Sequence, residues 1–515
     1  MKTNRIIILL MMMLMGMTDL SAQKHEFRGA WIHIVGNKEL QHMTTAEVQK
    51  LITDTFDDLQ EAGCNAVIFQ VRPQADAFYP SELEPWTRFL TGEQGKAPDP
   101  FWDPLAFAIE QAHNRGMELH AWCNPYRVTS NDEEVLWDQH LYFQRPDLFK
   151  RYGKQLYFDP GEPEARAHTV RVVADIVSRY DVDAIHFDDY FYPYPVRFEE
   201  FHDDHSFVKY AQEQGFEYWQ KSDWRRNNVE MLIRELNDTI KAIKPWVRFG
   251  ISPFGIHRNK KDHESGSATN GLSNYDELFA DVPAWGQKGI IDYIVPQLYW
   301  KIGHSAADYE VLINWWNDGG FTPHLYIGQN IAVMDEPDTK NPKETQLRRK
   351  IELSRELEGV AGNVWWPGWS LTRNDKNVKH RLETEFQQYP ALIPAYTALD
   401  SIAPEAPSRI HTHGNQLHWR VEPTDDPMQE ALFCILYVFP PHGKVDFENP
   451  KYIHKIIKGN GYDVPRSAKW KKGTRVAVSV VDRCWNESEP SPLYEWEGYE
   501  EEPTGMSIGG IHHKF

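Results

Sequence analysis

Two adjacent carboxylates, Asp188 and Asp189, stand at the end of an apolar run and are the sharpest chemical signal in the sequence. Aromatic residues follow them closely: Tyr190, Phe191, Tyr192 and Tyr194. Carboxylates beside aromatic rings are costly to bury unless they are solvated, paired or used in a reaction. The structural alternative is that one of them bonds loop amides or pairs with an arginine. Because a carboxyl group can donate or accept a proton, we take both as candidate catalytic residues for acid/base chemistry.

The composition favours a protein that handles sugars. Aromatic residues make up 13% of the 515 residues, and 75 residues are Asp or Glu. Flat rings stack on sugar faces, and carboxylates bond hydroxyl groups or move protons. A well-packed core explains the same composition, so the placement of these residues along the chain has to decide between the two interpretations.

Side-chain parity bears on which of the two carboxylates acts. A regular strand would direct at most one of them into a barrel. The spacing of Asp183, His186, Asp188 and Tyr190 is similar to the DxxDxDxE motif on the fourth strand of chitinase-like barrels. Here His186 replaces the middle aspartate and Tyr190 the catalytic glutamate. Substrate-assisted chitinase chemistry is therefore not transferable from the motif, but the parity favours Asp188 as the inward carboxylate.

Glycoside hydrolysis usually needs two carboxyl groups that flank the bond to be broken. One protonates the leaving oxygen, and the other attacks the sugar or activates water. The sequence does not decide which residue supplies the second carboxyl group. Several acidic residues that follow predicted strands are alternatives: Glu82, Glu84, Asp159, Asp262, Glu264 and Asp281. For the same reason, the sequence does not decide whether the reaction retains or inverts the configuration at the anomeric carbon.

Polar and aromatic residues at other strand ends are candidates for substrate binding. Amides can bond sugar hydroxyls or an acetamido group, tryptophans can stack on rings, and arginines can receive an anionic substrate or clamp the two aspartates. The predicted substrate-binding residues are Arg28, Trp31, Gln70, Arg72, Asn124, Tyr126, His186, Tyr190, Tyr192, Gln297, Tyr299, Trp300 and Trp365, and Arg127 and Trp366 are further candidates. Core packing is the alternative for each tryptophan. We expect no metal and no cofactor, and we interpret the His202–His205 cluster as a solvated loop.

Eight buried strands separated by helices are expected to position these residues. The strands are predicted at residues 27–35, 64–73, 117–126, 182–194, 246–256, 292–300, 323–331 and 362–371. The first helix begins with a capping box of Thr44 and Glu47 and ends at Gly63, and others are predicted near 104–115, 163–180, 223–243, 276–287, 306–317, 342–358 and 377–388. Eight strand–helix units predict an α/β fold, a parallel (β/α)₈ TIM barrel over residues 25–395. An open doubly wound sheet is disfavoured, because no glycine-rich loop follows the first strand.

A second, all-β domain is predicted after a Pro-containing linker at 403–407. Residues 416–421, 432–439, 452–457 and 475–481 alternate as sandwich strands do. The stretch 476–491 resembles the penultimate strand and following loop of fibronectin type III domains. We therefore expect a small fibronectin type III-like sandwich at 404–497 and a tail at 498–515.

The N-terminus predicts export. Residues 1–22 combine a basic start, an apolar run and a small-residue cleavage site, so we expect a signal peptide and a periplasmic or secreted protein without a membrane anchor. The net charge of −20 disfavours nucleic acid as a partner. The four cysteines form no CxxC motif, so structural zinc is not expected, and a Cys434–Cys484 disulfide is one possibility. The sequence does not indicate an oligomeric state.

Several motifs together resemble the glycosyl-hydrolase-like 10 family of exported bacterial (β/α)₈ proteins. They are FRGAW at 27–31, HAWCNPYR at 120–127, YDVDAIHFDDYFYP at 180–193, SPFG at 252–255 and DYIVPQLYW at 292–300. Cys123 departs from the larger apolar residue expected there. The resemblance implies a glycosidase and suggests peptidoglycan glycan strands without stem peptides as the substrate. A carbohydrate-binding protein without turnover and a glycosidase for another polysaccharide are the alternatives.

Overall fold

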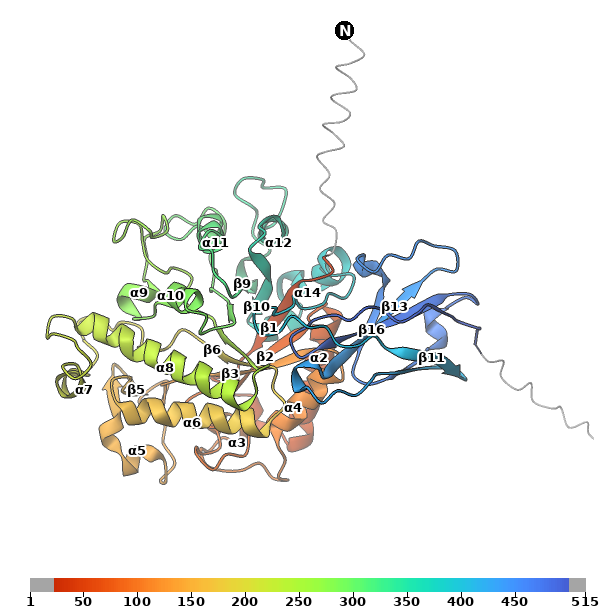
Figure 1. The fold of residues 1–515 in the computed structure, drawn as a ribbon. Helices are drawn as coiled ribbons and strands as arrows, with labels where there is room; N and C mark the ends of the chain where they lie inside the picture. Colours follow the sequence, from red (N-terminus) through yellow and green to blue (C-terminus); the bar gives the residue numbers. More distant parts are fainter. Residues whose placement is uncertain (1–22, 500–515) are drawn as a thin grey trace, which may run out of the picture.

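A closed barrel of eight parallel strands forms the larger part of the protein in the computed structural model, which describes residues 23–499 (Figure 1). The order around the barrel is β1-β10-β9-β8-β7-β6-β3-β2. Each barrel strand therefore pairs with the barrel strands that precede and follow it in the sequence, and the first pairs with the last. The strands are β1 Phe27–Ile32, β2 Ala66–Arg72, β3 Glu118–Cys123, β6 Ala184–Phe187, β7 Arg248–Ile251, β8 Tyr293–Ile294, β9 His324–Asn330 and β10 Val360–Trp366. The predicted TIM barrel is therefore confirmed. The predicted signal peptide and most of the predicted tail lie outside the described residues.

Helices surround the barrel, and most of the longer ones lie where the apolar periodicity predicts them. An unpredicted helix begins at Asp204, so part of the His202–His205 cluster is helical rather than a loop. The longer ones are α2 Thr45–Glu61, α4 Pro104–His113, α6 Pro163–Arg179, α7 Asp204–Tyr210, α8 Lys221–Ile243, α10 Val282–Gln287, α11 Tyr309–Asn317 and α12 Gln346–Glu356. The short ones are α3 Arg88–Thr91, α5 Leu141–Gln144, α9 Asn274–Glu277, α13 Gly368–Thr372 and α14 Val378–Arg381. The capping box at Thr44 and Glu47 is present and begins α2. The helix predicted at 276–287 is broken into α9 and α10, because the backbone at Phe279 turns to a φ of 54°.

The strands end earlier than the sequence predicts, and this matters for the site. β6 ends at Phe187 rather than continuing to residue 194, so Asp188 and Asp189 lie just beyond the hydrogen-bonded ladder. Strict alternation of side chains therefore stops before the two carboxylates. His186 lies within the ladder and faces the barrel interior, as the alternation of side chains predicts. Asp188 and Asp189 lie beyond the ladder, so both can face the same side.

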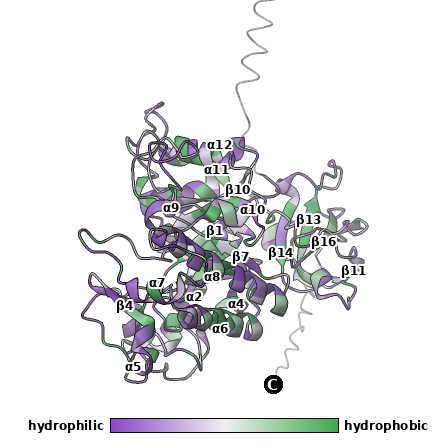
Figure 2. Cartoon of the chain, turned by 60° about the vertical axis from the view of Figure 1, so that its left-hand side comes forward, coloured by the Kyte–Doolittle hydropathy of each residue, from purple (hydrophilic) through white to green (hydrophobic). Residues whose placement is uncertain are grey.

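A small β domain follows the barrel and packs against it. One antiparallel sheet contains β11 Ser408–His413, β12 Gln416–Arg420 and β15 Gly461–Asp463, and the other contains β14 Ile453–Ile457, β13 Ala431–Phe439, β16 Arg475–Asp482 and β17 Tyr494–Glu495. The four strands predicted for this domain are confirmed. Figure 2 shows the predominantly hydrophobic colouring of β13 and β16, and β13 is almost entirely buried. A separate two-stranded hairpin of β4 Phe149–Tyr152 and β5 Gln155–Phe158 lies between β3 and α6 in the chain.

The β domain covers the N-terminal ends of the barrel strands. Trp485, just after β16, donates its indole N–H to Glu118, the first residue of β3, at 2.5 Å. Arg248, the first residue of β7, donates to the carbonyl oxygen of Arg483 at 2.6 Å, and Arg483 pairs with Asp181 at 2.7 Å. One buried apolar cluster contains residues of both domains. The opposite, C-terminal end of the barrel is therefore left free of this domain.

The four cysteines are free thiols in the structure. Cys434, on β13, receives a hydrogen bond from the indole of Trp419 at 3.2 Å, while Cys484 belongs to the cluster shared with the barrel. The disulfide that the sequence left open is therefore not formed. Among the described residues, no helix is long and apolar enough to cross a membrane.

Candidate active site

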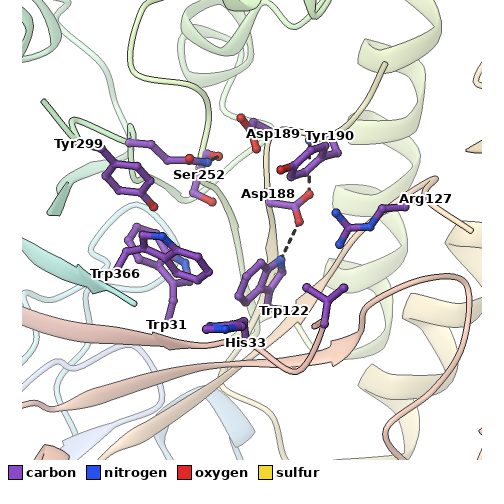
Figure 3. A pocket seen from close by; sticks show the side chains of 12 residues that line it. Trp31, His33, Trp122, Arg127, Asp188, Asp189, Tyr190, Ser252, Tyr299 and Trp366 are labelled. Carbon is purple, nitrogen blue, oxygen red and sulfur yellow. Dashed lines mark hydrogen bonds between the residues drawn. The ribbon is translucent and has the colours of Figure 1, made fainter. Parts of the chain in front are cut away.

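A cavity of about 390 Å³ opens at the C-terminal ends of the barrel strands (Figure 3). This is the end at which TIM barrels place their reactive groups, and the volume is within the range of small-ligand sites. Its lining consists of Trp31, His33, Val35, Trp122, Arg127, Asp188, Asp189, Tyr190, Ser252, Gln297, Tyr299 and Trp366. Within the part of the chain that the structure describes, Asp188 and Asp189 are the only acidic residues in that lining.

Asp188 is buried and held from two sides. The indole Nε1 of Trp122 donates to Asp188 Oδ2 at 3.0 Å, and the amide of Asn124 donates to Oδ1 and Oδ2 at 3.0 and 3.2 Å. Burial raises the pKa of Asp188, while the nearby Arg127 guanidinium and these two donors oppose that rise. The carboxylate is thereby fixed in orientation, with hydrogen-bond acceptor capacity remaining on its oxygens.

Asp189 lies in a different environment, although it is the next residue. It receives the hydroxyl of Tyr194, and burial together with the charge of Asp188 raises its pKa to about 7. A carboxyl group with a pKa near neutrality can hold a proton and release it during a reaction, which is the property required of a general acid. Two neighbouring carboxyls with different environments can therefore take different roles.

Aromatic rings form much of the wall around the two carboxyls. Trp31 from β1 and Trp366 from β10 lie across the cavity from Asp188, as Figure 3 shows. His33 packs against Trp366 with 4.8 Å between ring centroids, and Trp122 meets the same tryptophan edge-on at 6.1 Å. Rings arranged in this way offer faces on which a sugar can stack.

The remaining polar groups come from the loops after β7 and β8. Gln297 donates its amide to the Ser252 carbonyl at 3.0 Å, and its nearby side chain opposes the rise in the pKa of Asp189. Tyr299 lies on the wall opposite Asp189 (Figure 3). Burial and the two nearby carboxylates raise the pKa of Tyr299 well above its usual range, so its hydroxyl keeps its proton and is a hydrogen-bond donor.

The structure brings together about half of the residues predicted from the sequence. Those in the lining are Trp31, Asp188, Asp189, Tyr190, Gln297 and Tyr299, together with Arg127 and Trp366. Two more act from behind the lining. Asn124 holds Asp188, and His186 bonds Trp31 Nε1 and Ser252 Oγ at 3.1 and 3.0 Å.

Two of the predicted arginines lie outside the lining and have structural partners. Arg28 is near the start of β1, at the opposite end of the barrel, where it pairs with Glu26 at 2.7 Å. Arg72 forms a buried ion pair with Glu84 at 2.5 Å, and His168 bonds the same carboxylate at 3.0 Å. The prediction that Arg28 and Arg72 contact the substrate is therefore not supported by their positions. Each guanidinium is instead neutralised by a buried carboxylate.

The other predicted residues outside the lining are held by packing or by backbone contacts. Gln70 accepts the backbone N–H groups of residues 34 and 35, each at 2.8 Å, and so fixes the loop after β1. Tyr126 and Trp365 belong to the core between the strands and the helices. Tyr192 packs on Phe201 and Phe279, and Trp300 on Phe254. These five residues were predicted to bind the substrate, but they do not line the cavity. The reason is that side-chain direction changes from one residue to the next along a strand.

The structure also adds lining residues that the sequence argument did not select, chiefly Trp122 and Val35. Trp122 could have been found by parity, because His120, Trp122 and Asn124 alternate with buried outward residues of β3. The alternative second carboxylates do not contribute to the described lining. Glu84 is paired with Arg72, and Asp159 accepts the hydroxyl of Ser206 at 2.7 Å.

Comparisons with known proteins give matches along most of the chain. Residues 26–345 match the family described as Glycosyl hydrolase-like 10. Glycosyl hydrolase YngK of Bacillus subtilis (strain 168) is 42% identical over 427 residues, which cover 80% of this chain and 82% of the relative. Glycosyl hydrolase DigH of Escherichia coli (strain K12) is 36% identical over 365 residues, 65% of this chain and 82% of that one.

Among solved structures, the glycoside hydrolase domain of PgaB (BpsB) from Bordetella bronchiseptica aligns with a TM-score of 0.47 and 11% identity. The alignment covers 70% of this chain and 98% of that domain.

Proposed function

We propose, from the premise that this chain belongs to the glycosyl hydrolase-like 10 family and is a glycoside hydrolase, that it cleaves O-glycosidic bonds in peptidoglycan glycan strands. The assignment of the active site rests on one observation: Asp188 and Asp189 lie together in an aromatic-walled cavity at the C-terminal end of the barrel. Asp189, with its raised pKa, acts as the general acid toward the leaving oxygen. Asp188 is the ionised partner that its two donors hold in place.

The choice of a peptidoglycan strand is supported by the charge at the edge of the cavity. Arg127 lines the cavity, stacks over the ring of Tyr190 at 4.9 Å, and has a buried Nε with no hydrogen-bond partner among the described residues. Muramic acid residues carry a lactyl carboxylate once the stem peptide is removed. The guanidinium of an arginine that lines the cavity is suited to receive that carboxylate.

We also propose that the protein acts outside the cytoplasm and that its β domain is of the fibronectin type III-like kind. The first part is supported by the basic and apolar pattern of residues 1–22. The second is supported by the arrangement of described strands, with β11, β12 and β15 in one sheet and β14, β13, β16 and β17 in the other.

The test is incubation with peptidoglycan strands freed of stem peptides by an amidase, with products read by mass spectrometry. The wild type should release glycan fragments, and Asp188→Asn and Asp189→Asn should each reduce the rate by about 10²–10⁴. Asp238→Asn, at an exposed position of α8, is the matched control and should retain full activity. Binding of strands by the wild type without fragments would favour a carbohydrate-binding protein, and undiminished activity in both pocket variants would remove the site assignment.

A further inference from the structure

The two pocket carboxyls come from one point on the barrel rim. Asp188 and Asp189 are consecutive, with Cα atoms about 3.8 Å apart, and both line the cavity just beyond the end of β6. The facing wall consists of Trp31, Trp366 and Tyr299 (Figure 3). A double displacement by protein carboxylates needs one carboxyl on each side of the anomeric carbon. The described lining offers no acidic residue on the facing side, so it supplies neither a carboxylate nucleophile nor a carboxylate base opposite the two aspartates.

Asp188 is poorly placed to be that nucleophile. Its oxygens are fixed by Trp122 and Asn124, and Arg127 lies beside it. The backbone N–H of Tyr190 also donates to Asp188 at 3.4 Å. A carboxylate held by three hydrogen-bond donors is a directed acceptor, and each of these contacts lowers its readiness to form a covalent bond. An N–H group on the substrate is a suitable partner for the acceptor capacity that remains.

Tyr299 supplies a complementary donor on the facing wall. Its hydroxyl has no hydrogen-bond partner among the described residues, and burial together with the neighbouring carboxylates raises its pKa and keeps it protonated. A donor on one wall and an acceptor on the other match an amide group, which presents a carbonyl oxygen and an N–H in opposite directions. The sugars of bacterial glycan strands carry such an amide as the 2-acetamido group.

We propose that the substrate supplies the nucleophile: the 2-acetamido oxygen of the sugar next to the scissile bond attacks C1, with Asp188 receiving the acetamido N–H and Asp189 as the acid. The inference rests on the proposed function and narrows it to glycosides of 2-acetamido sugars. The chitinase motif itself is absent, since Tyr190 stands at the position of its glutamate. The chemistry requires only an acid and an acceptor, and two consecutive aspartates provide them.

The first step forms one bond and breaks one. Asp189 gives its proton to the glycosidic oxygen, the C1–O bond breaks with its electron pair on that oxygen, and the leaving group departs as an alcohol. The acetamido oxygen forms a new bond to C1 and closes a positively charged five-membered oxazolinium ring. Its N–H faces the Asp188 carboxylate, which balances the charge. Tyr299 orients the acetamido oxygen before attack.

The second step reverses the roles. A water molecule gives a proton to the Asp189 carboxylate as its oxygen bonds to C1. The bond between C1 and the acetamido oxygen breaks, and its electron pair returns to the acetamide. The product is a hemiacetal with the configuration of the starting glycoside, because C1 is attacked twice from opposite sides. Asp189 ends protonated and ready for the next cycle.

The acyl group is the variable that tests this step. Stem-peptide-free strands are chemically de-N-acetylated and then re-acylated with either acetyl or trifluoroacetyl groups. Fluorine withdraws electrons from the amide oxygen, so the trifluoroacetyl strands should be cut at least tenfold more slowly in kcat with little change in KM. Acetyl strands should recover the rate of untreated ones. Equal rates on the two re-acylated substrates would overturn the proposal while leaving the glycosidase function in place.

A second measurement works without turnover. The thiazoline of N-acetylglucosamine is a stable mimic of the five-membered ring, and its binding is measured by calorimetry. The wild type and the control Asp238→Asn should bind it, and Asp188→Asn should bind it at least tenfold more weakly with an unchanged melting temperature. Absence of binding to the wild type, or an inverted product anomer in proton NMR, would overturn the proposal. Failure of the proposed function would show instead as intact strands of every kind.

Discussion

The indole Nε1 of Trp31 donates a hydrogen bond to Nε2 of His186 at 3.1 Å, and this contact fixes the protons of a side-chain series along the barrel axis. An indole N–H is only a donor, so His186 Nε2 accepts and the ring proton lies on Nδ1. That proton points to the Tyr293 hydroxyl at 3.0 Å, which in turn donates to Nδ1 of His120 at 2.9 Å. His120 then donates from Nε2 to Glu118 at 2.8 Å. The floor of the cavity is thus connected to the far end of the barrel.

Removal of the central hydroxyl should destabilise the barrel. Tyr293→Phe leaves a nitrogen of His186 and a nitrogen of His120 without partners in a buried position. Each unsatisfied buried group costs about 1–3 kcal/mol, so the melting temperature should fall by several degrees in calorimetry. Tyr218→Phe, at an exposed position, is the control. Equal melting temperatures for the two variants would mean that the series contributes nothing to stability.

The position of Tyr293 also depends on a glycine of the neighbouring strand. A Cβ added at Gly250 would lie 1.9 Å from the Tyr293 ring, which is far inside contact distance. Gly250→Ala should therefore displace the ring, weaken both histidine contacts and lower the melting temperature, since overpacking of this kind costs about 1–3 kcal/mol. Gly289→Ala probes the effect of a methyl group where nothing lies within 4 Å, although its positive φ adds backbone strain. A wild-type melting curve for Gly250→Ala would contradict this packing argument.

The contact between the β domain and the barrel should be part of the barrel's stability. Trp485 is buried against the barrel end and donates to Glu118, which Arg248 also bonds. Trp485→Ala removes a large buried side chain, at a cost of about 3–5 kcal/mol, and leaves Glu118 with one donor fewer. We expect a lower melting temperature and faster proteolysis of the barrel. The control is Trp219→Ala, at a position where the tryptophan is 68% exposed. Two separate melting transitions with an unchanged barrel would show instead that the domains are independent.

The sequence predicts the barrel better than it predicts the contacts in the cavity, and the reason lies in what each depends on. The eight strands follow from buried runs of residues, which are local. Trp365 and Trp366 differ by one position, yet one is in the core and the other lines the cavity. Arg72 is neutralised by Glu84 from the loop after its strand, and Arg28, paired with Glu26, also donates to the carbonyl oxygen of the distant Tyr389. Such pairings depend on the register and on the end of each strand, and a local pattern does not contain them.

Activity should depend on pH through the two aspartates in opposite ways. Asp189 must be protonated to act as an acid, and its pKa is raised to about 7 by burial and by Asp188. The rate constant kcat/KM should therefore fall as the pH rises through about 7. Asp188 must be ionised, so the rate should also fall in acid, as the pH drops through the raised pKa of Asp188. The profile should be bell-shaped.

One hydroxyl offers a directional test of that assignment. Tyr194 donates to Asp189, and this hydrogen bond favours the ionised carboxylate and lowers its pKa. Tyr194→Phe should therefore raise the pKa of Asp189 further and move the alkaline limb of kcat/KM to higher pH, while Tyr218→Phe should leave it unchanged. A shift to lower pH, or none, would be inconsistent with Asp189 as the acid.

The same raised pKa predicts how stability changes with pH. The folded state favours the neutral form of Asp189, so the folded protein binds this proton more tightly than the unfolded chain does. The contribution of Asp189 is fully present below the unfolded pKa, near 4, and is lost as the pH rises through about 7. Asp189→Asn keeps the side chain neutral at every pH. The melting temperature of this variant relative to wild type should therefore increase between pH 5 and pH 8, and a constant difference across that range would show that the carboxyl does not titrate there.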